Sequence, residues 1–261
     1  MTSQPTLELR GIDKSFGPVH VLSSVDFTAT AGEVTALVGD NGAGKTTLVK
    51  CIGGIYHVDA GELIFDGTPR TVGGPRDAAA LGVEIVYQDL ALCDNLDIVD
   101  NMFLGRERIS RFRTLDENTM EKLARQALDS LSVRTVRSIR QRVASLSGGQ
   151  RQTVAIAKSV LWESKVVILD EPTAALGVAQ TEQVLDLVRR LAEHGVAVIL
   201  VSHNMNDVMR VADSIGVLFL GRMAAQVRRA DVTQTQVVEL ITAGRSGAMG
   251  LSPEESSEAT V

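Results

Sequence analysis

The chain has 261 residues, of which 44% are hydrophobic, and this is enough for one α/β domain or a domain with a subdomain. A formal net charge of −6 with only 3% aromatic residues argues against a nucleic-acid-binding surface as the main function. We interpret the arginine-rich residues 106–113 as a solvated face. The sequence has no apolar run near the roughly 18 residues that span a bilayer and no secretory signal pattern. It therefore predicts a cytosolic protein that reaches a membrane only through a partner.

The first third of the chain combines strands with a helix. Apolar runs separated by turn residues predict antiparallel strands over residues 6–12, 25–29 and 62–66. A buried strand is predicted over residues 33–38 and a helix over residues 47–55. One face of that helix would carry the apolar side chains Leu48, Cys51, Ile52 and Ile55.

A glycine-rich loop joins this buried strand to the helix. It matches the phosphate-binding pattern G-x-x-x-x-G-K-[ST] with Gly39, Asp40, Asn41, Gly42, Ala43, Gly44, Lys45 and Thr46. We assign these residues, and Thr47 after them, to nucleotide binding, because a loop before a helix N-terminus directs backbone N–H groups at phosphate. Lys45 would reach the β and γ phosphates, and Thr46 would give its hydroxyl to Mg²⁺. The alternative is a plain glycine-rich turn, and the loop alone leaves the class of phosphate-loop ATPase open.

Beyond the first third of the chain, the sequence predicts a helical region followed by further strands. From about residue 89 to 158 the pattern is helical, which predicts a helical subdomain inserted in a sheet domain; its spacing is carried by Met120, Leu123, Ala124, Ala127, Leu128 and Leu131. Strands return at residues 166–170, 196–202 and 215–220, and a helix over residues 178–193 ends at His194 and Gly195. We expect one ATPase domain over residues 1–243 and a polar, disordered tail over residues 244–261.

Two further motifs follow the loop in a fixed order. Residues 146–150 spell LSGGQ, and the apolar strand that follows ends in Asp170 and Glu171. Loop, LSGGQ and acidic strand end in this order resemble the ATP-binding cassette (ABC) ATPases, and the resemblance covers nearly the whole chain. It implies an α/β fold with a phosphate-loop (RecA-like) nucleotide-binding core, an antiparallel β subdomain and the inserted helical subdomain. The implied cofactors are ATP and Mg²⁺.

The catalytic residues are expected at strand ends, where open α/β sheets bind ligands. Asp170 would hold Mg²⁺ through water, and Glu171 would orient or deprotonate the attacking water, although two acids could also merely cap a strand before Pro172. By the resemblance, Gln88 contacts Mg²⁺ and the attacking water, and His203 contacts the γ-phosphate. Phe16 matches the family's adenine-stacking aromatic, with an ordinary core phenylalanine as the alternative.

The LSGGQ segment is predicted to begin a helix. Ser147 is a plausible N-cap, and Gly148 and Gly149, followed by Gln150, would expose backbone N–H groups to an anion. Because Lys45 already serves the phosphates of the same chain, a second phosphate site implies a second nucleotide. The resemblance implies that two cassettes pair head to tail, each LSGGQ closing over the partner's ATP. The chain departs from the family at Gly177, where the loop after the catalytic acid commonly ends in Asp.

The residues that flank the motifs resemble those of one branch of the family, the bacterial importers for monosaccharides of the ribose, xylose and fructose type. The resemblance implies a homodimer, or pairing with a second cassette, at the cytoplasmic face of the plasma membrane. Permease subunits would contact residues 88–105, and an external sugar-binding protein would deliver substrate. We expect no nucleic-acid partner. Transport of another solute, a non-transport ABC ATPase of repair or translation, and a regulatory module without turnover remain as alternatives.

Overall fold

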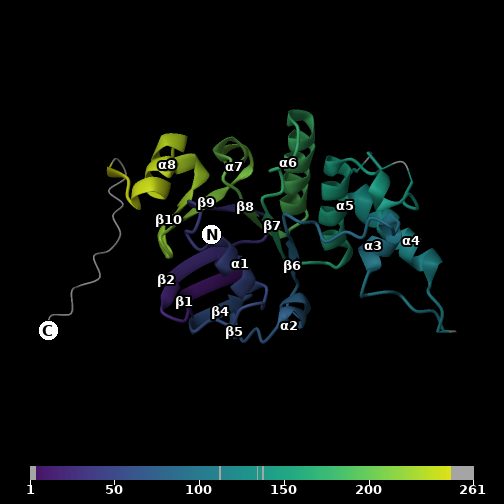
Figure 1. Cartoon of the computed structure of the whole chain (residues 1–261), viewed down its shortest axis with the longest axis horizontal. Coiled ribbons are helices and arrows are strands. Elements are labelled where there is room, and N and C mark those ends of the chain that lie inside the picture. The colour runs from purple at the N-terminus through teal and green to yellow at the C-terminus, as the bar shows by residue number, and fades with distance from the viewer. Residues whose placement is uncertain (1–3, 112, 134, 137, 248–261) are drawn as a thin grey trace.

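The computed structural model describes residues 4–111, 113–133, 135–136 and 138–247 (Figure 1). The strands are β1 (Leu7–Phe16), β2 (Val19–Ala29), β3 (Val34–Val38), β4 (Ala60–Phe65), β5 (Thr68–Arg70), β6 (Val83–Val86), β7 (Val166–Asp170), β8 (Ala197–Val201), β9 (Ser214–Phe219) and β10 (Arg222–Arg228). The helices are α1 (Lys45–Ile52), α2 (Pro75–Ala80), α3 (Ile98–Phe103), α4 (Glu117–Ser130), α5 (Gly148–Leu161), α6 (Val178–Glu193), α7 (Met205–Val211) and α8 (Gln234–Ala243). Short 3-10 helices cover Val143–Ser145 and Arg229–Asp231.

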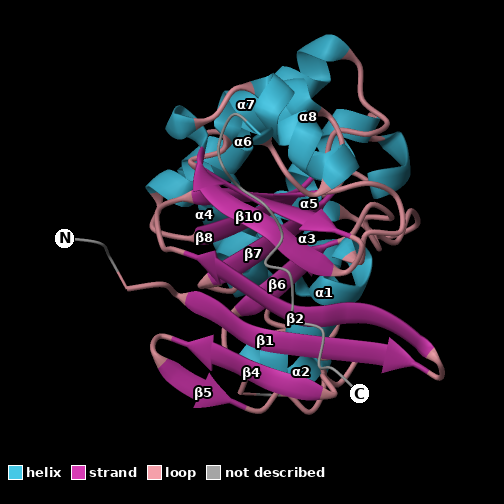
Figure 2. Cartoon of the chain, turned by 90° about the vertical axis from the view of Figure 1, so that its left-hand side faces the viewer, coloured by secondary structure: helices cyan, strands magenta, loops and turns pink. Residues whose placement is uncertain are grey.

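A four-stranded antiparallel sheet, in the order β2-β1-β4-β5, forms one layer (Figure 2). Alternate residues of β1 bury Leu7 and Leu9 in a core that also contains Leu48 of α1 and Ile168 of β7. The predicted strands in this region are confirmed but are longer than expected. Pairing of β1 with β2 continues to Phe16 and Val19, because a tight turn closes the hairpin between them.

A six-stranded sheet, in the order β10-β9-β3-β8-β7-β6, forms the second layer. The pairs are parallel except for β9 with β10. Every residue of β3 and β8 is buried, as expected for parallel strands covered on both faces. Since β3, β6, β7 and β8 run in the same direction, the segments that follow them meet at one edge of the sheet. The phosphate-loop α/β architecture predicted from the sequence is therefore present.

Helices α3, α4 and α5 pack together beside this sheet, at the far end of the molecule from α8 (Figure 1). The predicted apolar spacing of α4 is confirmed, because Met120, Ala124, Ala127 and Leu128 are buried in their shared core. Helix α5 continues to Leu161, past the expected end of the helical region at residue 158. The division into subdomains remains a prediction.

Two details of the sequence-based expectations are wrong. Helix α1 ends at Ile52 rather than at residue 55, since Gly53 and Gly54 follow and Gly54 has a φ of +71°. Ile55 is consequently 44% exposed instead of lying on the buried helix face. Of the expected tail, residues 248–261 lie outside the described residues, whereas Ser246 is buried and its hydroxyl donates to Glu239 of α8 at 2.8 Å. Among the described residues, no helix combines the length and the apolar character that crossing a bilayer requires.

Candidate active site

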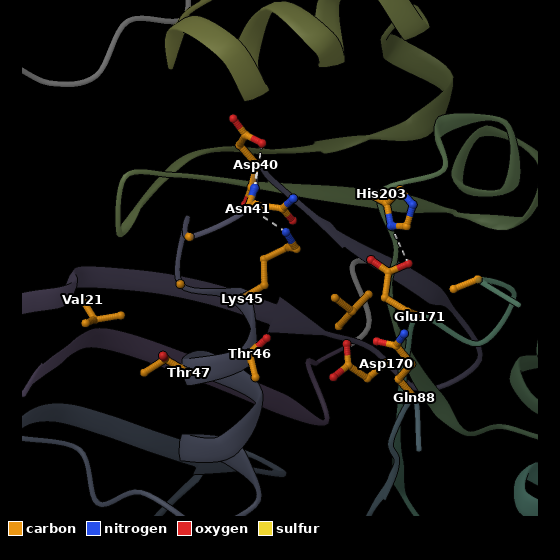
Figure 3. Close-up of a pocket in the computed structure, with 14 residues that line it drawn as sticks. Val21, Asp40, Asn41, Lys45, Thr46, Thr47, Gln88, Asp170, Glu171 and His203 are labelled. Atoms are coloured by element: carbon orange, nitrogen blue, oxygen red, sulfur yellow. Dashed lines mark hydrogen bonds and ion pairs between the residues drawn. The ribbon is translucent and has the colours of Figure 1, made fainter. Parts of the chain in front are cut away.

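A cavity of about 440 Å³ opens at the edge where β3, β6, β7 and β8 end (Figure 3). It contains most of the predicted nucleotide and catalytic residues. Its lining comprises Val21, Asp40, Asn41, Gly42, Gly44, Lys45, Thr46, Thr47, Gln88, Asp170, Glu171, Ala174, Val201 and His203. The structure therefore brings together the phosphate loop, the acidic strand end, the glutamine and the histidine from four separate parts of the sequence.

The phosphate loop is held tightly from behind. A Cβ on Gly39 would overlap the carbonyl oxygen of Leu218 in β9, and one on Gly44 would lie 2.8 Å from the Leu22 side chain. Gly44 also has a φ of +106°, which favours glycine. Ala43 is buried, and its carbonyl accepts a 3.0 Å hydrogen bond from the backbone N–H of Gly221. Gly39 and Ala43 thus support the loop without lining the cavity.

Lys45 begins α1 and points into the cavity (Figure 3). Its Nζ donates to the carbonyl oxygens of Gly39, at 2.7 Å, and Asp40, at 3.0 Å. Burial lowers the pKa of Lys45, while the negative charges of Glu171, Asp40 and Asp170 oppose that effect. The ammonium group is thus positioned over the loop that would cradle phosphate.

Asp170 and Glu171 deliver two carboxylates to the same cavity from the end of β7. Burial raises the pKa of Asp170, and the neighbouring Glu171 raises it further, whereas Lys45 lowers it. Glu171 has a φ of +49°, an uncommon backbone conformation for a residue with a side chain. Its N–H donates to Val201 of β8 at 2.9 Å, so neighbouring strands maintain this strained position.

His203 follows β8 and contacts Glu171 directly. Its Nδ1 lies 2.8 Å from Oε2 of Glu171 (Figure 3). The histidine side chain is 67% exposed and the glutamate side chain only 15% exposed, so His203 is the solvent-facing member of the pair. His203 therefore lies just after the C-terminal end of β8 and lines the cavity, as expected, while its contact with the γ-phosphate stays a prediction.

Three oxygen donors suited to Mg²⁺ line this one cavity. They are the hydroxyl of Thr46, the side-chain amide oxygen of Gln88 and the carboxylate of Asp170. Hydroxyl, amide and carboxylate oxygens are hard ligands of the kind that Mg²⁺ takes while retaining several waters. The donor set therefore fits the predicted ion.

Phe16 does not line the cavity. It lies at the end of β1, is 42% exposed, and packs edge-on against Tyr56 with ring centroids 5.0 Å apart. Val21, farther along β2, does line the cavity. Phe16 is thus an exposed aromatic on the strands that border the cavity, and its stacking on adenine stays a prediction.

The LSGGQ residues lie outside the cavity, at the start of α5. The predicted N-cap is confirmed: Ser147 Oγ accepts from the N–H of Gln150 at 3.3 Å, and Gln150 Oε1 accepts from the N–H of Ser147 at 2.9 Å. A Cβ on Gly149 would lie 3.2 Å from Gln180, and one on Gly148 would lie 3.4 Å from Leu176. This helix start therefore adjoins α6 and the loop before it, rather than the phosphate loop of its own chain.

Sequence reasoning missed the lining residues Val21, Ala174 and Val201. They have no reactive group, and only the fold brings them together. Gly177, where the sequence departs from the family pattern, is the N-cap of α6. A Cβ at this position would meet nothing within 4 Å.

The family profile described as ABC transporter matches residues 22–174, which include the phosphate loop, LSGGQ and the acidic strand end. The chain belongs to this family. As an ABC protein it binds nucleotide, and the cavity with the phosphate loop is the place in the described chain that carries the corresponding motif.

Curated relatives of this ABC protein resemble it over most of its length. It is 43% identical to the fructose import ATP-binding protein FrcA of Rhizobium meliloti, covering 94% of this chain and 96% of the relative. It is 41% identical to the xylose/arabinose import ATP-binding protein XylG of Sulfolobus acidocaldarius, covering 94% and 97%. With the ribose import ATP-binding protein RbsA of Lacticaseibacillus paracasei it shares 39% identity over 89% of this chain but only 46% of the relative.

Solved ATP-binding cassettes share the fold of this ABC protein. A nucleotide-free cassette of an ABC transporter superposes with a TM-score of 0.77 at 23% identity, over 86% of this chain and 92% of that structure. The ADP conformation of the cassette MJ1267 superposes with a TM-score of 0.78 at 23% identity, over 92% and 96%. These likenesses confirm the predicted fold class.

Proposed function

We propose that the chain is the ATP-hydrolysing subunit of an ABC transporter that imports a carbohydrate, in particular a monosaccharide. The observation that carries the proposal is that one cavity contains Lys45, Asp170 and the Glu171–His203 pair. The near full-length relatives named for import of fructose and of xylose or arabinose support the choice of solute class. An importer of another solute is the second candidate.

Residues of the phosphate loop would bind the triphosphate. Residues 40–42, 44 and 45 line the cavity just before and at the start of α1, so backbone N–H groups of this loop would bind phosphate. Lys45 would exchange its two carbonyl partners for phosphate oxygens. Thr46, Gln88 and Asp170 would hold Mg²⁺, which supplies charge neutralisation on the β and γ phosphates when bound. Phe16 would stack on the adenine from the strands beside Val21.

Glu171 would act as the base that receives a proton from the attacking water. Its Oε2 is engaged by His203 at 2.8 Å, which leaves Oε1 for the water. His203 is exposed enough to reach the γ-phosphate at the opening of the cavity, and would hold Glu171 and the phosphate in one arrangement. The low exposure of Glu171 limits its solvation, which strengthens its interaction with the water it orients.

A second copy of the chain would complete each site. The capped start of α5, with Gly148 and Gly149, lies outside the cavity of its own chain and would bind an anion through its free backbone N–H groups. Head-to-tail pairing would bring it over the γ-phosphate held by the partner. We accordingly infer a homodimer that closes on ATP and opens after hydrolysis.

Residues 88–105 would contact the permease, because this segment begins at the cavity with Gln88 and continues through α3. Contact there would connect the state of the nucleotide to the membrane subunits. The chain would accordingly work at the cytoplasmic face of the plasma membrane, with a sugar-binding protein outside it.

Reconstitution in proteoliposomes tests the proposed function. The chain, its permease and its sugar-binding protein are combined, and ATP-dependent uptake of labelled fructose, xylose and ribose is measured. We expect uptake of at least one sugar that requires ATP and disappears with Glu171→Gln, and ATP hydrolysis that rises when the loaded binding protein is added. Failure to copurify with the permease, together with ATP turnover that is indifferent to loaded binding protein, would contradict carbohydrate import.

A further inference from the structure

An exposed hairpin connects α3 to α4. Ile109 pairs antiparallel with Leu115, and the N–H of Ser110 donates to the carbonyl of Thr114 at 2.8 Å. Arg113 turns the chain with a φ of +59°, while residue 112 lies outside the described residues. In Figure 1 this segment projects past α4 at the lower right, away from both sheets. We name the described residues 105–111 and 113–116 the arginine hairpin.

The arginine hairpin combines exposed apolar and exposed basic side chains. Ile109 is 67% exposed and Leu115 is 53% exposed. Arg108, Arg111 and Arg113 are exposed as well. Both apolar residues lie on the paired arms, so the same short hairpin presents hydrocarbon and guanidinium groups together.

Among the described residues of the hairpin, Arg106 at its base forms the ion pair with the rest of the domain. Arg106 lies 3.4 Å from Glu84 of β6, and its guanidinium lies 4.9 Å from the Trp162 ring. Within the described part of the chain, by contrast, the side chains of Arg108, Arg111 and Arg113 form no ion pair. Three positive charges therefore protrude from a protein whose formal net charge is −6.

A solvated face, the simple interpretation of these arginines, does not account for the apolar residues between them. Guanidinium groups beside exposed aliphatic side chains are typical of segments that lie at a membrane surface, where hydrocarbon enters the headgroup boundary and arginine pairs with phosphate. A protein partner would need acidic groups matched to a narrow hairpin tip, whereas an anionic bilayer presents such groups at any lateral position. The charge pattern consequently favours lipid.

We propose that the arginine hairpin contacts the anionic phospholipid headgroups of the bilayer that surrounds the permease. Ile109 and Leu115 enter the headgroup boundary, and Arg108, Arg111 and Arg113 pair with lipid phosphates. The hairpin begins where the segment assigned to permease contact ends, so both face the membrane; in this respect the inference rests on the proposed function. The contact orients the helical part of the chain beside the permease.

The expected strength follows from the number of charges. Each arginine near an anionic leaflet strengthens binding by about fivefold, so three together contribute about a hundredfold. Acidic residues elsewhere in the protein weaken the attraction between the hairpin and the anionic leaflet only over short distances. The reason is that charges are screened within about 10 Å at 0.1 M salt. Binding should therefore be measurable at low salt and weaken as salt rises.

Flotation of the full chain with lipid vesicles tests the proposal. We expect binding to vesicles of phosphatidylcholine mixed with phosphatidylglycerol, and little binding to phosphatidylcholine alone. The triple variant Arg108→Glu, Arg111→Glu and Arg113→Glu should lose binding by at least about a hundredfold. The pair Ile109→Ser and Leu115→Ser should weaken binding while its salt dependence stays the same, because the charges remain.

The matched control reverses three exposed charges elsewhere, Lys122→Glu, Arg125→Glu and Arg245→Glu. It has the same net charge as the hairpin variant, so it should keep most of the binding if position matters. Equal binding by wild type and hairpin variant, or equal loss in the control, would overturn the proposal. So would a hairpin variant that binds vesicles normally but no longer copurifies with the permease. ATP turnover without vesicles is measured in parallel. A wild-type protein that does not hydrolyse ATP would count against the proposed function and not against the lipid contact.

Discussion

The carboxylate of Glu171 and the imidazole of His203 are in contact, with Oε2 and Nδ1 2.8 Å apart, although the two residues follow different strands. The pairing of β7 with β8 creates this contact, because it sets Asp170 opposite Val201. A shift in that register would separate the proposed base from the residue that orients it. The relationship therefore links the packing of the sheet to the chemistry proposed for the cavity.

Replacing Glu171 with Gln should trap an ATP-bound dimer. The amide keeps the shape of the side chain but cannot accept the proton of the attacking water, so hydrolysis should fall by at least about a hundredfold while ATP binding remains. Phosphate release and size-exclusion chromatography with ATP measure the two effects. The control is Asp40→Asn, an exposed carboxylate of the same cavity that accepts from the N–H of Asn41 in the described part of the chain. A Glu171→Gln protein that hydrolyses ATP at the wild-type rate would remove Glu171 from its proposed role.

Ser147→Arg should block ATP-driven dimerisation and leave nucleotide binding by the monomer intact. Ser147 lies outside the cavity but caps α5, so a bulky cation there would occupy the surface proposed to meet the partner's phosphate. The control, Ser147→Ala, removes the same cap at a cost of about 1 kcal/mol without adding bulk, and should still dimerise. Fluorescent-nucleotide titration and light scattering separate the outcomes. Loss of monomer binding would argue that LSGGQ acts within its own chain.

Gly177→Asp should change the cooperativity of ATP hydrolysis. The site is the N-cap of α6 with free space for a side chain, so an aspartate can be added without strain and should raise stability by a few tenths of a kcal/mol. Gly177→Ser adds a cap without a charge and serves as the control. A change in the Hill coefficient with Asp but not with Ser would assign the effect to the carboxylate. If neither variant alters it, the absent carboxylate has no influence on coupling.

Arg140 should stabilise the helical part of the chain. Its guanidinium lies 2.6 Å from Glu121, 2.9 Å from Glu117, 3.1 Å from Asp97 and 4.0 Å from Asp100, which joins the start of α3 to α4. Arg140→Met leaves these carboxylates facing one another and should lower the free energy of unfolding by about 1–2 kcal/mol. Urea denaturation measures the loss, and Arg125→Met on the exposed side of α4 is the control.

The pH dependence of that loss follows from the charge of Arg140. The hydrogen bond to Glu121 raises the pKa of Arg140 above its ordinary value, so the guanidinium is charged in both folded and unfolded chains at every pH below that value. Its contribution to stability should therefore be constant between about pH 6 and pH 9. A loss that varies strongly across this interval would be inconsistent with a contribution from the fixed charge of Arg140.

Asp170→Asn should stabilise the protein without nucleotide while it abolishes Mg²⁺-dependent turnover. Burial and the adjacent Glu171 both disfavour the charge on Asp170, so removing that charge should raise the free energy of unfolding. Thermal unfolding in the presence of a chelator measures the gain, and the exposed residue change Glu163→Gln is the control. A variant that is less stable than the wild type would show that Asp170 has a structural role instead.

Features with local causes were predictable from the sequence. The bounds of α6 agree with the expected residues 178–193, since an amphipathic run ends at Gly195, which has a φ of +84°. The cap at Ser147 was equally predictable, because its partner is Gln150. Strand β10 escaped prediction because its mixed residues are only partly buried at the sheet edge.

Contacts between distant segments could not be predicted from local patterns. The pairing of Glu171 with His203 depends on two parallel strands and not on nearby sequence. For the same reason, the resemblance could assign Phe16 to the adenine, whereas only the fold shows that Val21 lines the cavity and Phe16 does not. The motifs were enough to predict which residues could bind nucleotide or act in hydrolysis. The positions of these residues relative to one another depend on the strand pairing of the sheet.

The hydrogen bond from Gly221 to Ala43 sets a lower limit on the size of a working fragment. The turn between β9 and β10 holds the back of the phosphate loop, and the carbonyl of the same Gly221 accepts from Ser23 on β2 at 2.8 Å. A truncated chain that ended before β9 would retain every motif residue named for ATP and Mg²⁺, yet it would lose the support that keeps the loop in its binding shape. We therefore expect nucleotide affinity to depend on the chain as far as Gly221, beyond the last motif residue, His203.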